Sequence, residues 1–257
     1  MCLAVLALNT HPDLPLLLVA NRDEYHARPT AAAQPWKDMP DLYAGKDLTA
    51  GGTWLGVTRQ GRYALLTNYR DPSSVIADAP SRGALVLDYL AGRKDPLGYA
   101  QTVLKQGERY NGFNLLVGDA SGCALAANRS DEPARLLAPR LYGLSNRLLD
   151  TPWPKVVRLR QAVEQTLKQD STPDVEKLLG LLADRTPAAD EDLPKTGVSL
   201  ERERMLSPVF IADEHYGTRC STVITVNADG LIRMYERRFG PAGVLAGDSC
   251  WEFWRTS

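Results

Sequence analysis

The chain has 257 residues, of which 44% are hydrophobic and 24% charged, a composition typical of folded globular proteins and unlike that of disordered or collagen-like chains. Its 30 basic and 31 acidic residues give a formal net charge of -1, which excludes a bulk attraction to nucleic acid or to anionic membranes. Because no linker, repeat or sharp change in composition interrupts the sequence, we predict a single domain over residues 1–257.

The first half of the chain predicts two hairpins followed by two helices. Four short apolar runs bounded by turn residues are typical of paired strands, at residues 2–8, 14–21, 53–58 and 62–68. Between the hairpins, residues 31–47 lack periodicity, so we expect a surface loop that carries Trp36. Apolar residues at helical spacing then predict helices within 81–92, with Ser81 as N-cap, and within 96–110.

The second half predicts strands, helices and strands again. Its strands are expected as two hairpins and a short closing strand, within residues 113–128, 218–239 and 250–254. Amphipathic spacing predicts helices within 153–169 and within 172–186, the second with Pro173 near its start. Residues 186–208 are polar and contain prolines, so we expect a mobile excursion there. This order indicates an α+β fold of antiparallel sheets with two pairs of helices segregated as layers.

Neither a membrane anchor nor a metal centre is indicated. The apolar stretch Leu14–Ala20 is interrupted by Pro15 and is far shorter than the roughly 20 residues that span a bilayer. No lysine or arginine precedes Arg22, so no secretory signal is indicated and we expect a cytoplasmic protein. Metal-ligand spacing is missing from the three histidines and from the cysteines, which are Cys2, Cys123, Cys220 and Cys250. We therefore predict no metal site, no required cofactor, no integral membrane segment and no nucleic-acid partner.

Cys2 is placed to act as a nucleophile once Met1 is removed, because aminopeptidases remove methionine when the next residue is small. Removal gives Cys2 an α-amino group with a reference pKa of about 7.7 to 8.0, beside a thiol of about 8.5. The amine is then a base near neutral pH that accepts the thiol proton, so one residue supplies both nucleophile and base. The alternative is that Cys2 only packs, as a small buried residue at the start of a strand.

The segment Asn21-Arg22-Asp23-Glu24 follows the strand expected to pair with that of Cys2. There Asp23 would orient the α-ammonium group, and an inward Arg22 would favour the thiolate and attract an anionic substrate. Asn21 and Arg22 are accordingly candidate substrate-binding residues. The alternative is a charged turn that closes a strand.

Three further residues offer groups that acyl transfer requires. Asn68 and Asn146 each end an apolar run, and their side-chain amides would donate hydrogen bonds to an oxyanion. Arg219 opens a late strand and would bind a substrate carboxylate. The alternatives are local: asparagine also terminates strands through its own backbone contacts, and an arginine at a strand edge is common.

Motifs spread from Cys2 to about Thr222 support the functional interpretation of these residues. They are MC, VANRDEYHARP, GGTWLGV, LLTNYRD, YNGFNLL, YGLSN followed by TPWPK, and GTRCSTV. Their number and order resemble the NRDE protein family, also called the transport and Golgi organization 2 family. The resemblance implies an N-terminal nucleophile (Ntn) hydrolase fold, a four-layer αββα sandwich. It also implies a link to haem trafficking and to lipid or acyl-CoA homeostasis.

A more distant likeness is to the choloylglycine hydrolases and penicillin V acylases, which cleave amides with a mature N-terminal cysteine. The matching positions are Cys2, Asp23, Asn68, Asn146 and, by order only, Arg219. Where those enzymes have arginine before Asn-x-Asp, this sequence has Ala20. Because positions two apart share a face of a strand, Arg22 would in part replace the missing guanidinium.

Together these residues predict a cysteine Ntn hydrolase that acts on an amide or thioester of a small hydrophobic acyl substrate. The alternative is a carrier whose pocket holds haem or a fatty acyl-CoA, with Arg22 or Arg219 on carboxylate or phosphate. The third possibility is a structural protein without an active site. The expected partner is thus a small-molecule or lipid-like ligand, with haem as a bound ligand in the carrier only, and no oligomeric state is indicated.

Overall fold

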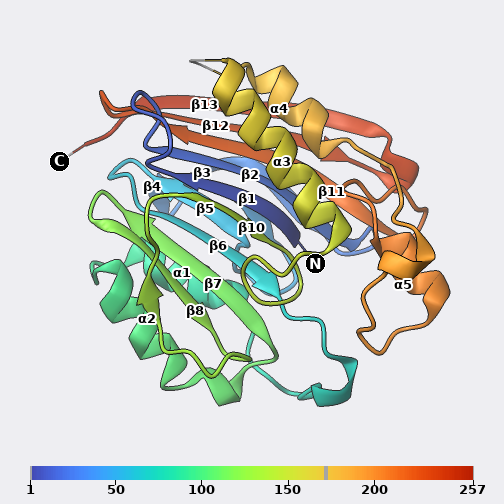
Figure 1. Cartoon of the computed structure of the whole chain (residues 1–257). Helices are drawn as coiled ribbons and strands as arrows, with labels where there is room; N and C mark the ends of the chain where they lie inside the picture. The colour runs from blue at the N-terminus through green and yellow to red at the C-terminus, as the bar shows by residue number, and fades with distance from the viewer. Residues whose placement is uncertain (1, 171–172, 257) are drawn as a thin grey trace.

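The computed structural model describes residues 2–170 and 173–256, and its strands form two antiparallel sheets (Figure 1). The six-stranded sheet has the order β10-β1-β2-β11-β12-β13, with strands at Leu141–Leu144, Cys2–Leu8, Leu16–Tyr25, Tyr216–Val226, Leu231–Phe239 and Leu245–Trp254. The seven-stranded sheet runs in order from β3 to β9, with strands at Thr30–Trp36, Met39–Asp47, Leu55–Thr58, Tyr63–Asn68, Phe113–Asp119, Gly122–Ala127 and Arg135–Leu136.

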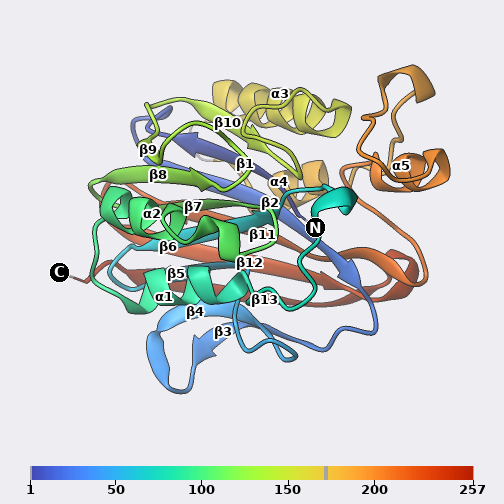
Figure 2. The same ribbon diagram turned by 90° about the horizontal axis from the view of Figure 1, so that it is seen from below.

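Two pairs of helices cover the outer faces of the sheets (Figures 1 and 2). Helices α1 (Gly83–Ala91) and α2 (Pro96–Leu104) pack on the seven-stranded sheet, whereas α3 (Pro154–Gln169) and α4 (Val175–Leu182) pack on the six-stranded one. The predicted α+β sandwich with segregated helix pairs is confirmed. Thr172, the first residue of the stretch predicted for α4, lies outside the described residues.

Both faces of the six-stranded sheet are covered, and strand β1 shows the consequence. Its even-numbered residues, such as Ala4 and Leu6, pack between the two sheets, whereas Leu3 and Val5 pack against α3 and α4. A strand buried on both sides is continuously apolar rather than alternating, which is why this run is so uniform in the sequence. Cys2 is even-numbered, so the same alternation directs its side chain into the layer between the sheets.

The surface loop predicted for residues 31–47 is wrong, because strands β3 and β4 form a hairpin there. Trp36 is buried, and its indole Nε1 donates a hydrogen bond to the carbonyl oxygen of Ala44 at 3.1 Å. The pairing shifts register at two places along β3. Such bulges remove the regular alternation by which a strand is identified from sequence.

Other boundaries also differ from the prediction. Residues 186–208, expected as a mobile excursion, contain helix α5 (Leu200–Leu206), whose Glu203 and Leu206 are buried. Ser81 is not the N-cap of α1, since Arg82 occupies that position without a capping side-chain bond. The closing strand β13 is longer than expected and begins at Leu245. Across the described ranges, no helix combines the length and apolar character needed to cross a membrane.

Candidate active site

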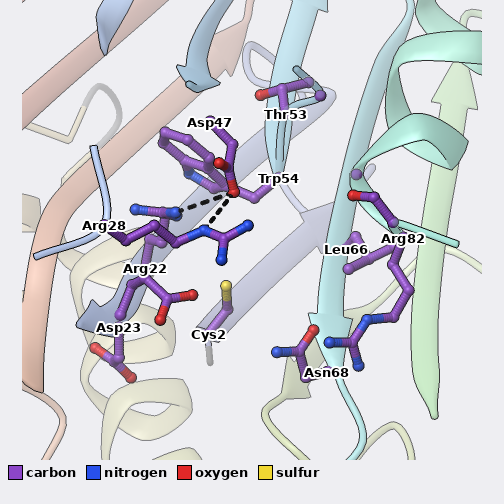
Figure 3. A pocket seen from close by; sticks show the side chains of 14 residues that line it. Cys2, Arg22, Asp23, Arg28, Asp47, Thr53, Trp54, Leu66, Asn68 and Arg82 are labelled. Carbon is purple, nitrogen blue, oxygen red and sulfur yellow. Dashed lines mark hydrogen bonds and ion pairs between the residues drawn. The ribbon is translucent and has the colours of Figure 1, made fainter. Parts of the chain in front are cut away.

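Cys2 begins the strand that lies between β10 and β2. It pairs with Arg22 of β2, and on the other side β1 pairs with β10 as far as Ala4 and Leu144, two residues before Asn146. Only 6% of Cys2 is exposed, and its sulfur points into a cavity (Figure 3). Met1 lies outside the described residues, so its removal stays a prediction.

The Cys2 cavity has a volume of about 150 Å³ and opens between the ends of the two sheets. Its lining comes from β2, the end of β4, the segment before β5, strand β6 and the start of α1. The residues are Cys2, Arg22, Asp23, Glu24, Arg28, Asp47, Gly52, Thr53, Trp54, Leu66, Asn68, Ser81, Arg82 and Gly83. Six of these residues carry charged side chains, so the cavity suits a small polar group better than a large apolar one.

Arg22 lies inside the cavity because β2 continues through Tyr25 rather than ending at Asn21. Its guanidinium donates to Thr30 Oγ1 at 3.2 Å, and its carbon Cζ lies 4.1 Å from the centre of the Trp54 ring. A cation over an indole face is a favourable, partly desolvated contact. The NRDE segment is therefore part of a buried strand rather than a charged turn.

Asp47 provides the main negative charge beside Arg22. It accepts a hydrogen bond from Arg28 Nε at 2.8 Å and lies 3.8 Å from Arg22 Nη2. Burial opposes its ionisation, but hydrogen bonds from Arg28 and from the backbone N–H groups of Ala50 and Thr49 outweigh it, so the pKa of Asp47 is lowered. Asp47 is therefore ionised at neutral pH and partly neutralises both arginines.

The Cys2 thiol itself is not activated by its surroundings. Burial raises its pKa above the ordinary value, and the nearby Arg22 offsets this only in part. A neutral thiol is a poor nucleophile, since the thiolate is the reactive form. The site therefore requires a base next to the sulfur, and an α-amino group on Cys2 itself would meet that requirement.

Asp23 directs its carboxylate away from Arg22, into a group of side chains that we call the buried charged cluster: Asp23, Arg70, Lys155 and Glu203. Its Oδ1 accepts a hydrogen bond from Thr218 Oγ1 at 2.8 Å. Burial raises the pKa of Asp23, and the positive charge of Lys155 acts against this rise. Asp23 also lines the Cys2 cavity, so the cluster lies directly behind the start of β1.

Lys155 is an unexpected member of the buried charged cluster. Only 3% of the residue is exposed, and its Nζ donates to the carbonyl oxygen of Leu206 at 2.8 Å. Burial lowers its pKa to about 8, with Asp23 opposing the shift. The lysine therefore changes charge close to the pH at which an α-amino group would titrate.

We expect Lys155 to make the free energy of unfolding rise with pH between about 8 and 10.5. In that interval the unfolded chain binds a proton on Lys155 that the folded chain has lost, so stability increases by up to about 3 kcal/mol. Urea unfolding of wild type and Lys155→Met across this range measures the effect. Lys168→Met, which changes an exposed lysine on the same helix, is the control. Parallel curves for wild type and Lys155→Met would contradict the assignment.

The two predicted oxyanion donors lie together. Asn68 ends β6 and lines the cavity, and its backbone carbonyl accepts a hydrogen bond from Asn146 Nδ2 at 2.9 Å. Asn146 is fully buried, and the neighbouring Ser145 Oγ donates to the Cys2 carbonyl at 3.2 Å. An amide nitrogen has two hydrogens, so Asn146 keeps a second donor beyond its bond to Asn68. The structure thus brings Cys2, Asn68 and Asn146 to one place.

Asn21 and Arg219 are not brought to the cavity. Asn21 faces the helix layer, where its Nδ2 donates to the carbonyls of Leu182 and Val209 at 2.8 and 2.9 Å and its Oδ1 accepts from Ser221. Its amide is fully used in holding α4 and the segment after α5 to β2.

Arg219 lies at a β-bulge of β11 and donates through Nη1 to the carbonyls of Tyr25 and Arg28 at 2.8 and 3.0 Å. It thus holds the turn that carries Arg28, and it does not line the Cys2 cavity.

Several cavity and cluster residues were missed from the sequence. Arg28 and Asp47 lie beside and at the end of the segment predicted as a loop, whereas Trp54 lies in a predicted strand. Arg82 and Lys155 lie at the starts of helices. The sequence signal for the last two was a basic residue at a helix start, where the helix dipole disfavours a cation. That unfavourable placement is a reason to look for a function.

Comparison with known proteins places the chain in a defined group. The family model described as "Transport and Golgi organisation 2" matches residues 1–241. The Transport and Golgi organization protein 2 homolog of Bos taurus is 36% identical over 241 residues, covering 86% of each chain. The Homo sapiens homolog is 34% identical over 237 residues, again with 86% of each chain covered. The Drosophila melanogaster protein of that name is 29% identical over 260 residues, covering 92% of this chain and 91% of its own.

Among solved structures, the chain is similar to the C2A mutant of the conjugated bile acid hydrolase from Clostridium perfringens. The TM-score is 0.54 at 10% sequence identity, and the match covers 98% of this chain and 92% of that one. At this identity the likeness concerns the fold. It agrees with the predicted fold, a sandwich of two antiparallel sheets flanked by pairs of helices.

Proposed function

Because the chain belongs to the Transport and Golgi organisation 2 family and has an Ntn hydrolase fold, we propose that it is a cysteine Ntn hydrolase of small acyl amides or thioesters. The observation that carries this proposal is the position of Cys2, at the start of a central strand with its sulfur in a cavity that Asn68 also lines, while Asn146 donates to the Asn68 carbonyl from behind the lining. The six charged residues of the lining favour a small polar substrate over the hydrophobic acyl group expected from the sequence.

The reaction proceeds in two steps after Met1 is removed. The α-amine of Cys2 takes the thiol proton, and the thiolate attacks the substrate carbonyl carbon. Amide N–H groups of Asn68 and Asn146 stabilise the oxyanion of the tetrahedral intermediate. As the intermediate collapses, the α-ammonium returns its proton to the leaving amine or thiolate, and Cys2 is left as a thioester. Water, deprotonated by the α-amine, attacks this thioester and releases a carboxylic acid and the Cys2 thiol.

The Asp23 carboxylate is proposed to bind and orient the α-ammonium group of Cys2. The supporting observations are its burial in the charged cluster and its contribution to the cavity wall behind β1. Its electrostatic partners Lys155 and Arg70 already compensate a negative charge. The charge of Asp23 is therefore compensated even while the α-amine is neutral. The α-ammonium pairs with Asp23 only in the part of the cycle in which the amine holds the thiol proton.

The carrier alternative, a protein that binds haem or a fatty acyl-CoA, has less support from this geometry. A cavity of about 150 Å³ is smaller than the roughly 300 to 1,000 Å³ typical of sites for drug-sized ligands. Among the described residues of its lining, Cys2 is the one that carries a thiol or imidazole, and the large apolar side chains are those of Trp54 and Leu66. These walls fit a small acyl group better than a macrocycle or a long acyl chain.

The proposal is tested with protein expressed without an N-terminal tag. Intact mass spectrometry should show loss of Met1, and incubation with S-butyryl-N-acetylcysteamine should acylate Cys2, as located by peptide mapping, with thiol released over many turnovers. The control is the same chain with an N-terminal histidine tag, in which Cys2 has no α-amine. Equal thiol release by both forms, or acylation of other cysteines only, would overturn the proposal.

A further inference from the structure

Arg82 is a charged residue in the Cys2 cavity that the proposed mechanism does not use. It lies directly before α1, lines the cavity, and donates through Nη1 to the carbonyl oxygen of Gly112 at 2.9 Å. Within residues 2–170 and 173–256, no carboxylate forms an ion pair with it. A guanidinium carries five N–H donors and remains charged, so most of its binding capacity is available to a ligand.

The other two arginines of the cavity differ from Arg82 in this respect. Arg28 is paired with Asp47 at 2.8 Å, and Arg22 contacts Thr30, Asp47 and the Trp54 ring. Both are held in place by protein groups that partly neutralise them. Arg82 is therefore the arginine of the cavity whose guanidinium forms no ion pair with a carboxylate of the described residues.

Burial opposes the charge of Arg82. Its guanidinium also lies near the atoms that react. Burial lowers its pKa, although a guanidinium stays protonated, so the charge is held at a cost that an anion would offset. Figure 3 shows its guanidinium beside Asn68, on the side of the cavity facing Cys2. Glu24 also lines the cavity, with Oε1 accepting from the N–H of Tyr25, and its charge disfavours a second anionic group there.

We propose that Arg82 binds a single carboxylate of the substrate, close to the carbonyl that Cys2 attacks. The substrate class is then an acyl amide or thioester that carries one carboxylate, either on the acyl group or on the leaving group. The planar guanidinium matches a carboxylate in a bidentate arrangement, which fixes orientation as well as charge. This inference rests on the proposed function, and it assigns to Arg82 the substrate-binding role that Arg219 was expected to have.

The test compares three thioesters of similar size with protein that has lost Met1. S-butyryl-N-acetylcysteamine has no carboxylate, S-succinyl-N-acetylcysteamine has one on the acyl side, and the butyryl thioester of 3-mercaptopropionate has one on the leaving group. We expect one carboxylate probe to show a kcat/KM about 10- to 100-fold above the neutral probe, as for one hydrogen-bonded charge pair. The probe that is preferred identifies the side of the substrate that Arg82 contacts.

Arg82→Gln should remove this preference and Arg82→Lys should retain part of it, where the preference is the ratio of kcat/KM for the carboxylate probe to kcat/KM for the neutral probe in the same variant. Arg135→Gln, which changes an exposed arginine of β9, is the control and should keep the full preference. Equal kcat/KM values for the three probes in wild type, or a preference that survives in both Arg82 variants, would overturn the inference while leaving the proposed function intact. Absence of Cys2-dependent hydrolysis of every probe would instead overturn the proposed function.

Discussion

Replacing Cys2 with alanine should abolish thiol release from S-butyryl-N-acetylcysteamine, with a loss of rate on the order of 10⁴-fold or more. Removal of a covalent nucleophile eliminates the acyl-enzyme route, and what remains is the weak effect of binding and oxyanion contacts on direct attack by water. Steady-state release of thiol, followed with a chromogenic disulfide, measures the change. A residual rate within tenfold of wild type would show that Cys2 is only a packing residue.

The matched control for this variant is Cys123→Ala. Cys123 is also a buried cysteine in the layer between the sheets, and its thiol contacts Tyr63 rather than the Cys2 cavity. Burial raises its pKa to about 12, so it remains a neutral thiol at every pH of interest. Both alanine variants remove one small buried side chain, and we expect similar small losses of stability by urea unfolding. Only Cys2→Ala should lose activity.

The sequence predicted those parts of the fold whose burial is regular. The apolar runs at residues 2–8 and 14–21 became β1 and β2 because a strand covered on both faces needs apolar residues at every position. Residues 31–47 were missed because the register of the β3–β4 hairpin shifts at two places, which removes the regular alternation of a strand. Helix α5 was missed because it is short and polar, and its buried residues contact other segments: Glu203 pairs with Arg70, and Leu206 packs with Ile211 and Tyr216.

The residues of the candidate site also fall into those whose positions the sequence predicts and those whose positions it does not. The proximity of Cys2 and Arg22 follows from the pairing of β1 with β2, which the sequence predicts. Asn146 is brought near by strand β10, which is not among the strands predicted from the sequence. Arg82 and Lys155 were missed because their positions depend on how α1 and α3 pack on the sheets, which no local pattern records.

Asn21 shows the opposite error. Its place in the NRDE segment predicts a substrate-binding residue. One step along a strand turns a side chain to the other face, where its amide holds helix and loop carbonyls.

Replacing Glu203 with alanine should destabilise the protein by about 3 to 5 kcal/mol, the typical cost of removing one partner of a buried ion pair. Glu203 Oε2 lies 2.8 Å from Arg70 Nη1, with only 5% and 6% of the two side chains exposed. Its other oxygen accepts a hydrogen bond from the N–H of Thr196 at 3.0 Å. The variant leaves the Arg70 charge buried without the carboxylate that its guanidinium contacts, and urea unfolding at pH 7 measures the loss.

Two further variants separate charge from packing in this prediction. Glu203→Gln keeps an acceptor for Thr196 and should lose less stability than Glu203→Ala. The double variant Arg70→Met with Glu203→Leu removes both charges and should recover much of the lost stability, since buried ion pairs are often no better than apolar packing. If the double variant is as unstable as the sum of its single variants, the cost comes from the shape of the site rather than from an unpaired charge.

The same ion pair is linked to catalysis through the backbone of Arg70, whose N–H donates to the carbonyl of Asn146 at 2.8 Å. Arg70 therefore connects α5 to the residue proposed to stabilise the oxyanion. We expect the double variant to fold well and to hydrolyse the neutral thioester at least about tenfold more slowly than wild type, with little change in KM. Such a loss confined to kcat is what a displaced oxyanion donor produces, since that contact forms only in the transition state. An unchanged kcat would show that the position of Asn146 does not depend on the buried charged cluster.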